Sequence, residues 1–210
     1  AGVKGQSEVM DVLTDGTEDT SVFEGKVMFD LRFTVLRPGA ADNDDVILVD
    51  LEVQNEVTDD LVKRAIYYCS RMLDAQRNTR FKGNQYGRLR KVVSIWICPN
   101  CPESLAGSVR LYNINELIKK GDLTKHRNKA DYDMMEIAMI YLGKEPPPEK
   151  PSCEHLLHTL FTEKLSIDEK MFILQKDYGF SHTKEENDMV NITKMLIDIE
   201  RDLAKKEGKA

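Results

Sequence analysis

Two short runs of alternating apolar and polar residues open the patterned part of the chain, at residues 26–36 and 46–54. Alternation with a period of two predicts β-strands, with the polar side chains gathered on one face of each strand. Residues 37–45 between the two runs are rich in Pro, Gly and Asp, which is typical of a hairpin connection. We therefore expect two antiparallel neighbouring strands, preceded by a polar loop at residues 14–20.

A helix is predicted after the second strand, at residues 61–76, which contain neither Gly nor Pro. Thr58, Asp59 and Asp60 precede it and supply side chains that cap helix N-termini. Its apolar positions at helical spacing are Leu61, Ala65, Tyr68, Met72 and Ala75. Residues 92–98 are the most strand-like run, and we expect a central, buried strand there. The order strand, strand, helix, strand predicts an α/β fold with a helical crossover.

The pattern is less decisive between residues 109 and 142. Residues 109–114 are compatible with a further strand, and residues 115–118, with the lysines that follow, predict a short helix. Residues 134–142 are apolar enough for a strand or for a buried helix, and periodicity leaves both open.

Prolines mark the clearest boundary, at residues 144–151, because repeated prolines exclude helix and favour an extended linker. Helical periodicity recurs beyond it in three segments, at residues 153–164, 166–178 and 185–206. Ser166 and Glu169 have the spacing of a capping box. We therefore predict a core domain at residues 1–145, and a proline-rich linker with a helical extension at residues 146–210.

Composition narrows the class of protein. A formal net charge of -6 and a pI near 5.4 argue against a generally basic nucleic-acid coat protein. No apolar run approaches the roughly 20 residues that span a bilayer, and the first residues lack the apolar core of a signal peptide. The four cysteines are too few for a disulfide scaffold, and Cys98 and Cys101 lack the second ligand pair of a zinc site. We expect a cytoplasmic protein that does not enter a membrane.

Acidic side chains occupy strand positions where they need a partner. Asp50, Glu52 and Gln54 share one face of the second strand, and Asp30 can join them from the first. Burying uncompensated carboxylates costs several kcal/mol, roughly, so such acids usually meet a cation, a metal or solvent. A divalent-metal site is one hypothesis. The alternative is an ion pair between Asp30 and a helix cation such as Arg64, with Glu52 and Gln54 completing a polar sheet face.

Positive charge is concentrated in two places despite the acidic total. Residues 77–98 contain no acid and six basic residues, which are Arg77, Arg80, Lys82, Arg88, Arg90 and Lys91. Phe81 and Tyr86 in this stretch either stack on bases or, as we favour, anchor the loop. A second basic cluster at residues 119–129 is diluted by Asp122. Either cluster predicts salt-dependent phosphate contacts with little base reading, and a solvated surface is the alternative.

Several of these segments together resemble the PD-(D/E)XK nuclease-fold transposases, which are related to the recombination-promoting nucleases of bacteria. Residues 63–72, on the predicted helix, carry the most specific part of the resemblance. The other matching segments are residues 18–20, 24–25, 29–33, 51–54, 91–98 and 132–143, with the helical tail. The resemblance implies an α/β, restriction-endonuclease-like core with a mixed central sheet and a helical C-terminal extension. It also implies an N-terminal helix, and we expect the given sequence to begin after or within it.

The resemblance further implies a metal-dependent endonuclease, a hydrolase that cuts the phosphodiester bonds of DNA in transposition or recombination. The family's site positions fall on Asp30, Glu52 and Gln54, where Gln54 is neutral and stands in place of the lysine of the general motif. Asp30, Glu52 and the Val53 carbonyl are the expected ligands of Mg²⁺, or of Mn²⁺ in its place. Gln54 is expected to orient the attacking water, and Asp50 to support the ligands.

DNA is then the expected partner, and we expect the helix at residues 61–76 and the basic stretch at residues 77–98 to bind it. Arg64, Tyr67 and Arg71 lie about one turn apart on one side of the helix and can face the same cleft. The predicted nucleic-acid contacts are Arg64, Arg71, Arg77, Arg80, Lys82, Arg88, Arg90 and Lys91. The alternatives are a catalytically inactive DNA-binding or assembly module that keeps the fold, and a structural protein that forms homo-oligomers through its C-terminal helices.

Overall fold

The computed structural model describes residues 18–21, 25–28, 31–36, 46–148, 150–162 and 164–180. Its elements are β1 (Glu18–Ser21), β2 (Gly25–Met28), β3 (Leu31–Leu36), β4 (Val46–Val53), α1 (Leu61–Asp74), η1 (Tyr86–Arg88), β5 (Val92–Cys98), β6 (Ser108–Asn113), η2 (Lys129–Asp131), β7 (Met135–Tyr141), α2 (Cys153–Phe161) and α3 (Ile167–Tyr178). β1 and β2 form a two-stranded sheet, and the other described strands form a five-stranded sheet in the order β3-β4-β5-β7-β6. β5 is therefore the central strand, as predicted.

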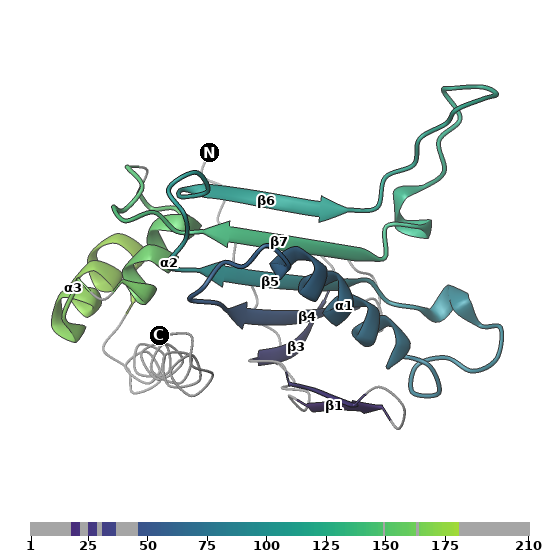
Figure 1. Cartoon of the computed structure of the whole chain (residues 1–210), viewed down its shortest axis with the longest axis horizontal. Coiled ribbons are helices and arrows are strands. Elements are labelled where there is room, and N and C mark those ends of the chain that lie inside the picture. Colours follow the sequence, from purple (N-terminus) through teal and green to yellow (C-terminus); the bar gives the residue numbers. More distant parts are fainter. Residues whose placement is uncertain are drawn as a thin grey trace. The chain divides into compact units, whose positions relative to one another are not determined.

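Strand directions in the larger sheet are mixed. β3 pairs antiparallel with β4, which confirms the predicted hairpin. The arrows of β4, β5 and β7 run the same way in Figure 1, whereas β6 runs the opposite way along one edge. α1 thus joins two parallel neighbours, β4 and β5, as a crossover helix does. These features confirm the predicted α/β class with a mixed central sheet.

The described residues group into two compact units. The first takes the described residues up to Glu52, with residues 62–95 and 111–138, and the second takes residues 53–61, 96–110 and the described residues from 139 onward. The predicted domain boundary after residue 145 stays a prediction. None of the described helices is long and apolar enough to cross a membrane.

The core of the first unit lies between α1 and strands of the sheet. Ala65, Cys69 and Met72 on α1 are buried, and so is Val92 on β5. The thiol of Cys69 donates to the backbone oxygen of Glu136 at 3.9 Å, which places the helix against β7. The predicted apolar stripe is therefore confirmed at Leu61, Ala65 and Met72, whereas Tyr68 and Ala75 are half-buried, and Cys69 joins it.

Helices α2 and α3 pack together in the second unit. Their buried apolar side chains are Leu160, Phe161, Met171 and Leu174. Nδ1 of the buried His155 lies 2.6 Å from the hydroxyl of Tyr178 and so ties the two helices together. Ser166 and Glu169 form the predicted capping box at the start of α3. Two of the three predicted C-terminal helices are thus confirmed, and the third, at residues 185–206, lies outside the described residues.

Two predictions about local structure were wrong. The single strand predicted at residues 26–36 is two strands, and the first of them, β2, pairs with β1, where the sequence predicts a loop. Ladder hydrogen bonds between backbones stabilise such a pair without an apolar pattern. The short helix predicted at residues 115–118 is absent, because side chains take up the local hydrogen bonds. Asp133 accepts from the Ile114 N–H at 3.2 Å, and the Asn115 side chain donates to the side-chain oxygen of Asn113.

Candidate active site

Strand β4 carries two carboxylates that are almost removed from solvent. Asp50 is 0% exposed and Glu52 is 6% exposed. Both lie on the same face of β4, because side chains alternate along a strand. Ser94 of β5, also buried, donates a hydrogen bond from Oγ to Oδ2 of Asp50 at 2.7 Å, and Arg32 lies opposite Asp50 in the β3–β4 register. The strand therefore has a polar face inside an otherwise apolar sheet.

Helix α1 covers this polar face. Burial raises the pKa of the Cys69 thiol to about 12, and the negative charge of Asp50 adds to the rise. The effect of Asp50 on Cys69 indicates that the helix lies over the acid-bearing part of β4. At neutral pH the thiol is protonated, so Cys69 is not the nucleophile of this site.

The described β3–β4 pairing ends next to one of the two acids that the sequence predicts as metal ligands, Glu52. The described pairing at this end of the hairpin finishes with Leu31 opposite Leu51. Along the chain, Asp30 directly precedes Leu31 and Glu52 directly follows Leu51. Asp30 itself lies outside the described residues, so its predicted role stays a prediction.

Of the remaining predicted site residues, Val53 is the last residue of β4 and Gln54 follows it directly. Val53 is buried and Gln54 is half-buried. The backbone N–H of Gln54 donates to the carbonyl of Ile97 at 2.8 Å, which holds the end of β4 beside β5. A cavity of about 750 Å³ begins at the next residue and is lined by the loops that follow β4, β5 and β7. In open α/β sheets, ligands commonly bind outside the carboxyl ends of the strands.

The donor chemistry of β4 fits a hard cation. The described residues contain no group of three or more His, Cys, Asp and Glu side chains that holds a metal by itself. Mg²⁺, however, keeps several waters and is commonly bound through only one or two carboxylates. Asp50 and Glu52 offer carboxylate oxygens in surroundings that exclude most water, which is the ligand type that Mg²⁺ and Mn²⁺ prefer.

One glutamine ties the basic stretch after α1 to the sheet. The buried Gln76 donates to the carbonyl of Arg90 at 3.0 Å and accepts from the Arg90 N–H at 2.7 Å. Phe81 is buried, and its ring lies 5.6 Å from that of Tyr86, which is 63% exposed. Phe81 therefore anchors the loop, as predicted, whereas Tyr86 faces solvent. α1 ends at Asp74, two residues earlier than predicted.

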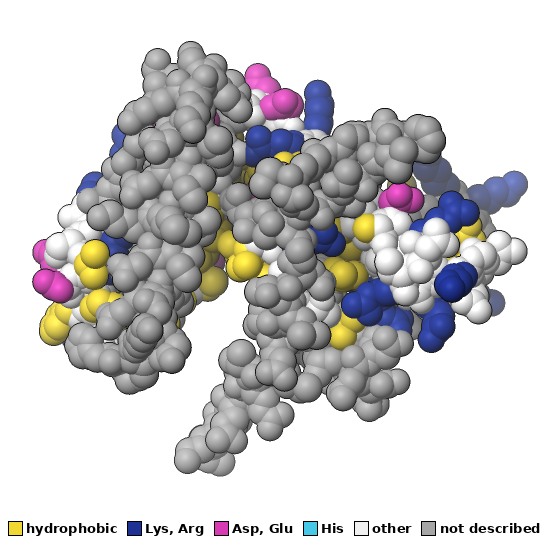
Figure 2. Space-filling view, turned by 90° about the horizontal axis from the view of Figure 1, so that it is seen from below, with side chains coloured by type: hydrophobic (Ala, Val, Ile, Leu, Met, Phe, Trp, Pro, Cys, Tyr) yellow, Lys and Arg dark blue, Asp and Glu magenta, His cyan; other side chains and the backbone are white. Residues whose placement is uncertain are grey.

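The cations predicted to bind phosphate differ in exposure. Exposed ones are Arg64, Arg77, Lys82 and Arg88, and half-buried ones are Arg80 and Arg90. In the view of Figure 2, many Lys and Arg side chains gather at the right-hand side. Arg71 is only 4% exposed, and its Nη1 donates to the hydroxyl of Tyr67 at 3.3 Å. Phosphate contacts by these residues stay predictions.

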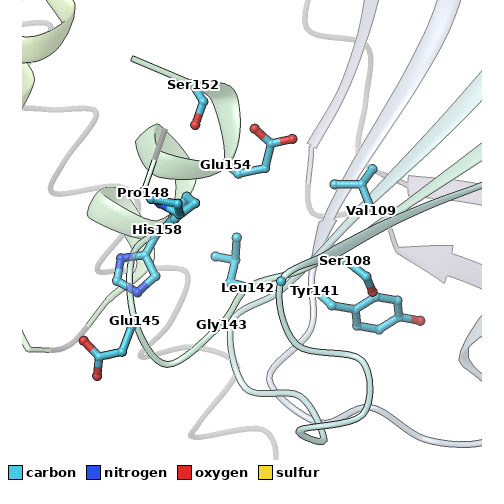
Figure 3. A pocket seen from close by; sticks show the side chains of 12 residues that line it. Ser108, Val109, Tyr141, Leu142, Gly143, Glu145, Pro148, Ser152, Glu154 and His158 are labelled. Atoms are coloured by element: carbon cyan, nitrogen blue, oxygen red, sulfur yellow. The ribbon is translucent and has the colours of Figure 1, made fainter. Parts of the chain in front are cut away.

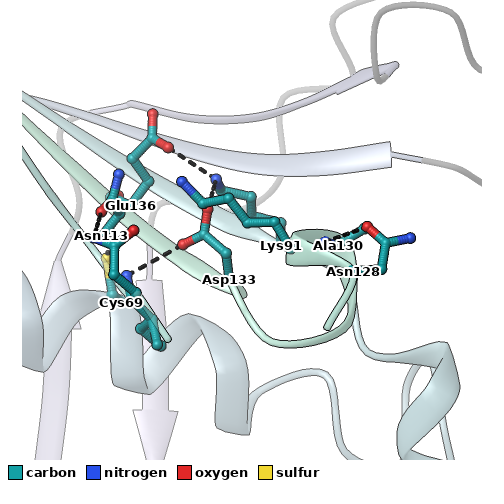
Figure 4. Close-up of polar contacts among 10 residues, drawn as sticks. Cys69, Lys91, Asn113, Asn128, Ala130, Asp133 and Glu136 are labelled. Atoms are coloured by element: carbon teal, nitrogen blue, oxygen red, sulfur yellow. Dashed lines mark hydrogen bonds and ion pairs between the residues drawn. The ribbon is translucent and has the colours of Figure 1, made fainter. Parts of the chain in front are cut away.

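Lys91 is held between two carboxylates, as Figure 4 shows. Its Nζ lies 3.0 Å from Oδ2 of Asp133 and 2.8 Å from Oε2 of Glu136. Burial favours a lower Lys91 pKa, but the two carboxylates outweigh burial, so the pKa is raised. In Asp133, burial is likewise outweighed by Lys91, and the pKa is lowered. A phosphate has to compete with both acids for Lys91.

A smaller cavity of about 300 Å³ lies in the second unit, between the start of β6, the end of β7 and α2 (Figure 3). His158 and Glu154 line it from α2, and Tyr141 from β7. Burial lowers the pKa of His158, so the imidazole is neutral at pH 7. None of the predicted site residues lines this cavity, and a sequence pattern for it is lacking.

The fold and the acid-bearing hairpin define an α/β protein of the restriction-endonuclease-like class. A comparison with known protein families matches residues 14–144 to the family described as PD-(D/E)XK nuclease family transposase. The chain belongs to this family, as the resemblance implies. Membership associates it with nuclease or transposase function, with DNA as substrate and with the divalent metals that such nucleases generally use. Searches of curated proteins and of solved structures found no match.

Proposed function

We propose that this chain is a metal-dependent DNA endonuclease that acts in transposition or recombination. The observation that carries the proposal is the pair of nearly dry carboxylates on β4, Asp50 and Glu52. Structural acids in a sheet usually occur near its surface, where water lowers the cost of their charge. Such a face is stabilised by positive charge, which a divalent cation can supply.

Asp30 and Glu52 are the proposed ligands, with Mg²⁺ as the physiological ion and Mn²⁺ as a substitute. They flank the last described pair of the hairpin along the sequence, and the Val53 carbonyl follows Glu52 directly. A divalent ion bound by these residues would supply an activated water and would offset negative charge on the phosphate. Asp50, hydrogen-bonded to Ser94, contributes negative charge beside the ligands and helps to retain the ion.

Gln54 is proposed to position the attacking water. Its side-chain amide both donates and accepts hydrogen bonds, so it can hold a water and direct one lone pair toward phosphorus. Being neutral, it does not offset charge in the transition state as a lysine ammonium does. Exposed cations of the first unit, Arg64, Arg77, Lys82 and Arg88, are proposed to supply phosphate contacts instead.

The alternative is a DNA-binding or assembly module without catalytic activity. The neutral Gln54 favours it, because the site then lacks the cation of the general motif. In that case Asp50 and Glu52 have a structural role, and the protein leaves DNA intact when a divalent metal is added.

Nicking of supercoiled plasmid tests the two functions. We expect cleavage with Mg²⁺ or Mn²⁺, none with EDTA, and a rate lowered at least about 100-fold in Asp30→Asn and in Glu52→Gln. Asp168→Asn, which neutralises an exposed acid on α3, is the matched control and should cleave normally. Cleavage that survives both site substitutions, or a wild-type protein that binds DNA and never cleaves it, would refute the endonuclease proposal.

A further inference from the structure

Residues 114–130 form an arm that projects from the sheet between β6 and β7. In Figure 1 the two limbs of the arm extend well beyond the ends of both strands. Every residue from 119 to 131 is exposed. A folded segment of this length that buries so little of itself needs a reason to persist, since ordering its backbone costs roughly 1 kcal/mol per residue or more.

Two carboxylates brace the arm across its limbs. Near the base, Asp133 accepts from the Ile114 N–H at 3.2 Å and lies 3.6 Å from Nζ of Lys129. Further out, Oε2 of Glu116 accepts from the Arg127 N–H at 3.1 Å and lies 3.1 Å from Nδ1 of His126. The arm therefore keeps a defined shape through its own polar contacts.

A third carboxylate shapes the tip. Oδ1 of Asp122 accepts from the N–H and the hydroxyl of Thr124, at 3.0 and 2.6 Å. These bonds lower the Asp122 pKa, so the group stays ionised and committed to the turn. Gly121 precedes it with a φ of +108°, which a residue with a side chain rarely adopts.

The cations of the arm are left facing solvent. Between residues 114 and 130 there are five basic and two acidic residues, in a chain whose total charge is -6. The basic ones are Lys119, Lys120, Lys125, Arg127 and Lys129. Both acids serve as internal acceptors of the arm, and the side chains of Lys119, Lys120 and Arg127 form no ion pair among the described residues. The arm thus presents fixed positive charge at a distance from the sheet.

We propose that the arm is a second DNA-binding element, which grips backbone phosphates of the duplex with Lys119, Lys120 and Arg127. The inference rests on the proposed function, because it takes DNA as the substrate. Positive charge on a preorganised projection fits a polyanion, and duplex DNA offers a phosphate every few ångströms along each strand. Contacts of this kind position the protein on DNA without reading its sequence.

The test compares two variants of equal charge. One carries Lys119→Gln, Lys120→Gln and Arg127→Gln, and the control carries Arg110→Gln, Lys150→Gln and Lys176→Gln, all exposed. Binding of a fluorescent 30-base-pair DNA duplex is measured by anisotropy between about 50 and 300 mM salt. Each phosphate contact contributes about 0.9 to the slope of log affinity against log salt. We expect the arm variant to lose about 2 to 3 from the slope and on the order of 100-fold in affinity at 150 mM, with the control near wild type.

The outcomes separate this inference from the proposed function. Equal slopes and affinities in the arm variant and the control would overturn the arm as a DNA-binding element, whatever the cleavage result. If the arm variant loses affinity and salt slope as expected but the wild-type protein never cleaves DNA, only the endonuclease proposal is overturned. Leu117 and Leu123 on the arm are 77% and 62% exposed and offer a protein contact instead. If Leu117→Ser with Leu123→Ser changes the size in solution while the arm variant keeps its DNA affinity, the arm serves protein assembly and the inference is wrong.

Discussion

Strand β4 and the arm of residues 114–130 place charge in opposite environments. On β4, Asp50 and Glu52 are carboxylates with almost no access to water, whereas on the arm the cations are exposed. Charge interactions are strong where water is excluded, so β4 suits the tight binding of one ion and the chemistry that follows. Exposed cations exchange counterions freely and suit reversible, salt-dependent contacts. The two regions therefore predict that cleavage and binding are separable by mutation.

The largest expected effect is that one variant loses the cleavage rate but keeps DNA affinity, whereas another loses affinity but keeps the rate. Glu52→Gln should lower the rate of single-turnover cleavage at saturating protein about 1,000-fold, because loss of a proposed metal ligand removes the stabilisation of negative charge that develops on the phosphate. The same variant should keep its DNA affinity within about threefold of wild type. The triple arm variant should do the reverse, losing affinity at 150 mM salt while keeping the single-turnover rate once DNA is saturated. Quench-flow cleavage and anisotropy on the same preparations measure both. A common loss of rate and affinity in either variant would contradict the comparison.

The sequence predicts features of these two regions that depend on local side-chain alternation, and it misses those that depend on contacts between distant residues. The period-two pattern on β4 reports which side chains share a face, so Asp50 and Glu52 are found together from the sequence alone. The partner of Asp50 is harder to predict. Ser94 interrupts an apolar strand by a single residue, and only the pairing of β4 with β5 brings its hydroxyl to the carboxylate. The lone polar position in that run is the signal that the sequence offers.

The arm shows the opposite limit. Its lysines are visible in the sequence, but the same residues suggest a short helix at 115–118. Whether the acids dilute the positive charge depends on long-range contacts, such as that between Glu116 and the Arg127 N–H, which local propensity does not contain. In the same way, the lysine of the basic stretch that is closest to β5, Lys91, is engaged by Asp133 and Glu136 from β7 and its approach. Counting charges along a chain does not reveal which of them are available.

An intermediate effect is expected at the base of the arm. Asp133→Ala leaves the Ile114 N–H without its acceptor and removes one of the two carboxylates on Lys91. We expect the free energy of unfolding to fall by about 2–3 kcal/mol, measured by urea denaturation at pH 7. Asp131→Ala, which removes an exposed acid nearby, should change it by less than about 0.5 kcal/mol.

The pH dependence of that loss tests whether charge is its cause. The Asp133 pKa is lowered from its ordinary value of 3.8, so its charge contributes stability above 3.8 and loses the contribution as the pH falls through the lower folded pKa. The difference between wild type and Asp133→Ala should be constant from pH 5 to 8 and should shrink below pH 3.8. A difference that is as large at pH 3 as at pH 7 would assign the effect to packing.

The smallest effect is the sharpest test of why the arm keeps its shape. Glu116→Ala removes the acceptor of the Arg127 N–H, and it also makes the arm more positive by one charge. If charge alone governs binding, this variant should bind DNA more tightly. If the contact between Glu116 and the Arg127 N–H holds the arm in shape, the Arg127 amide should exchange its hydrogen about fivefold faster, which corresponds to a loss of about 1 kcal/mol of local stability. The DNA affinity should then fall. Hydrogen exchange read beside anisotropy decides between the two, because only loss of preorganisation predicts faster exchange together with weaker binding in a more positive arm.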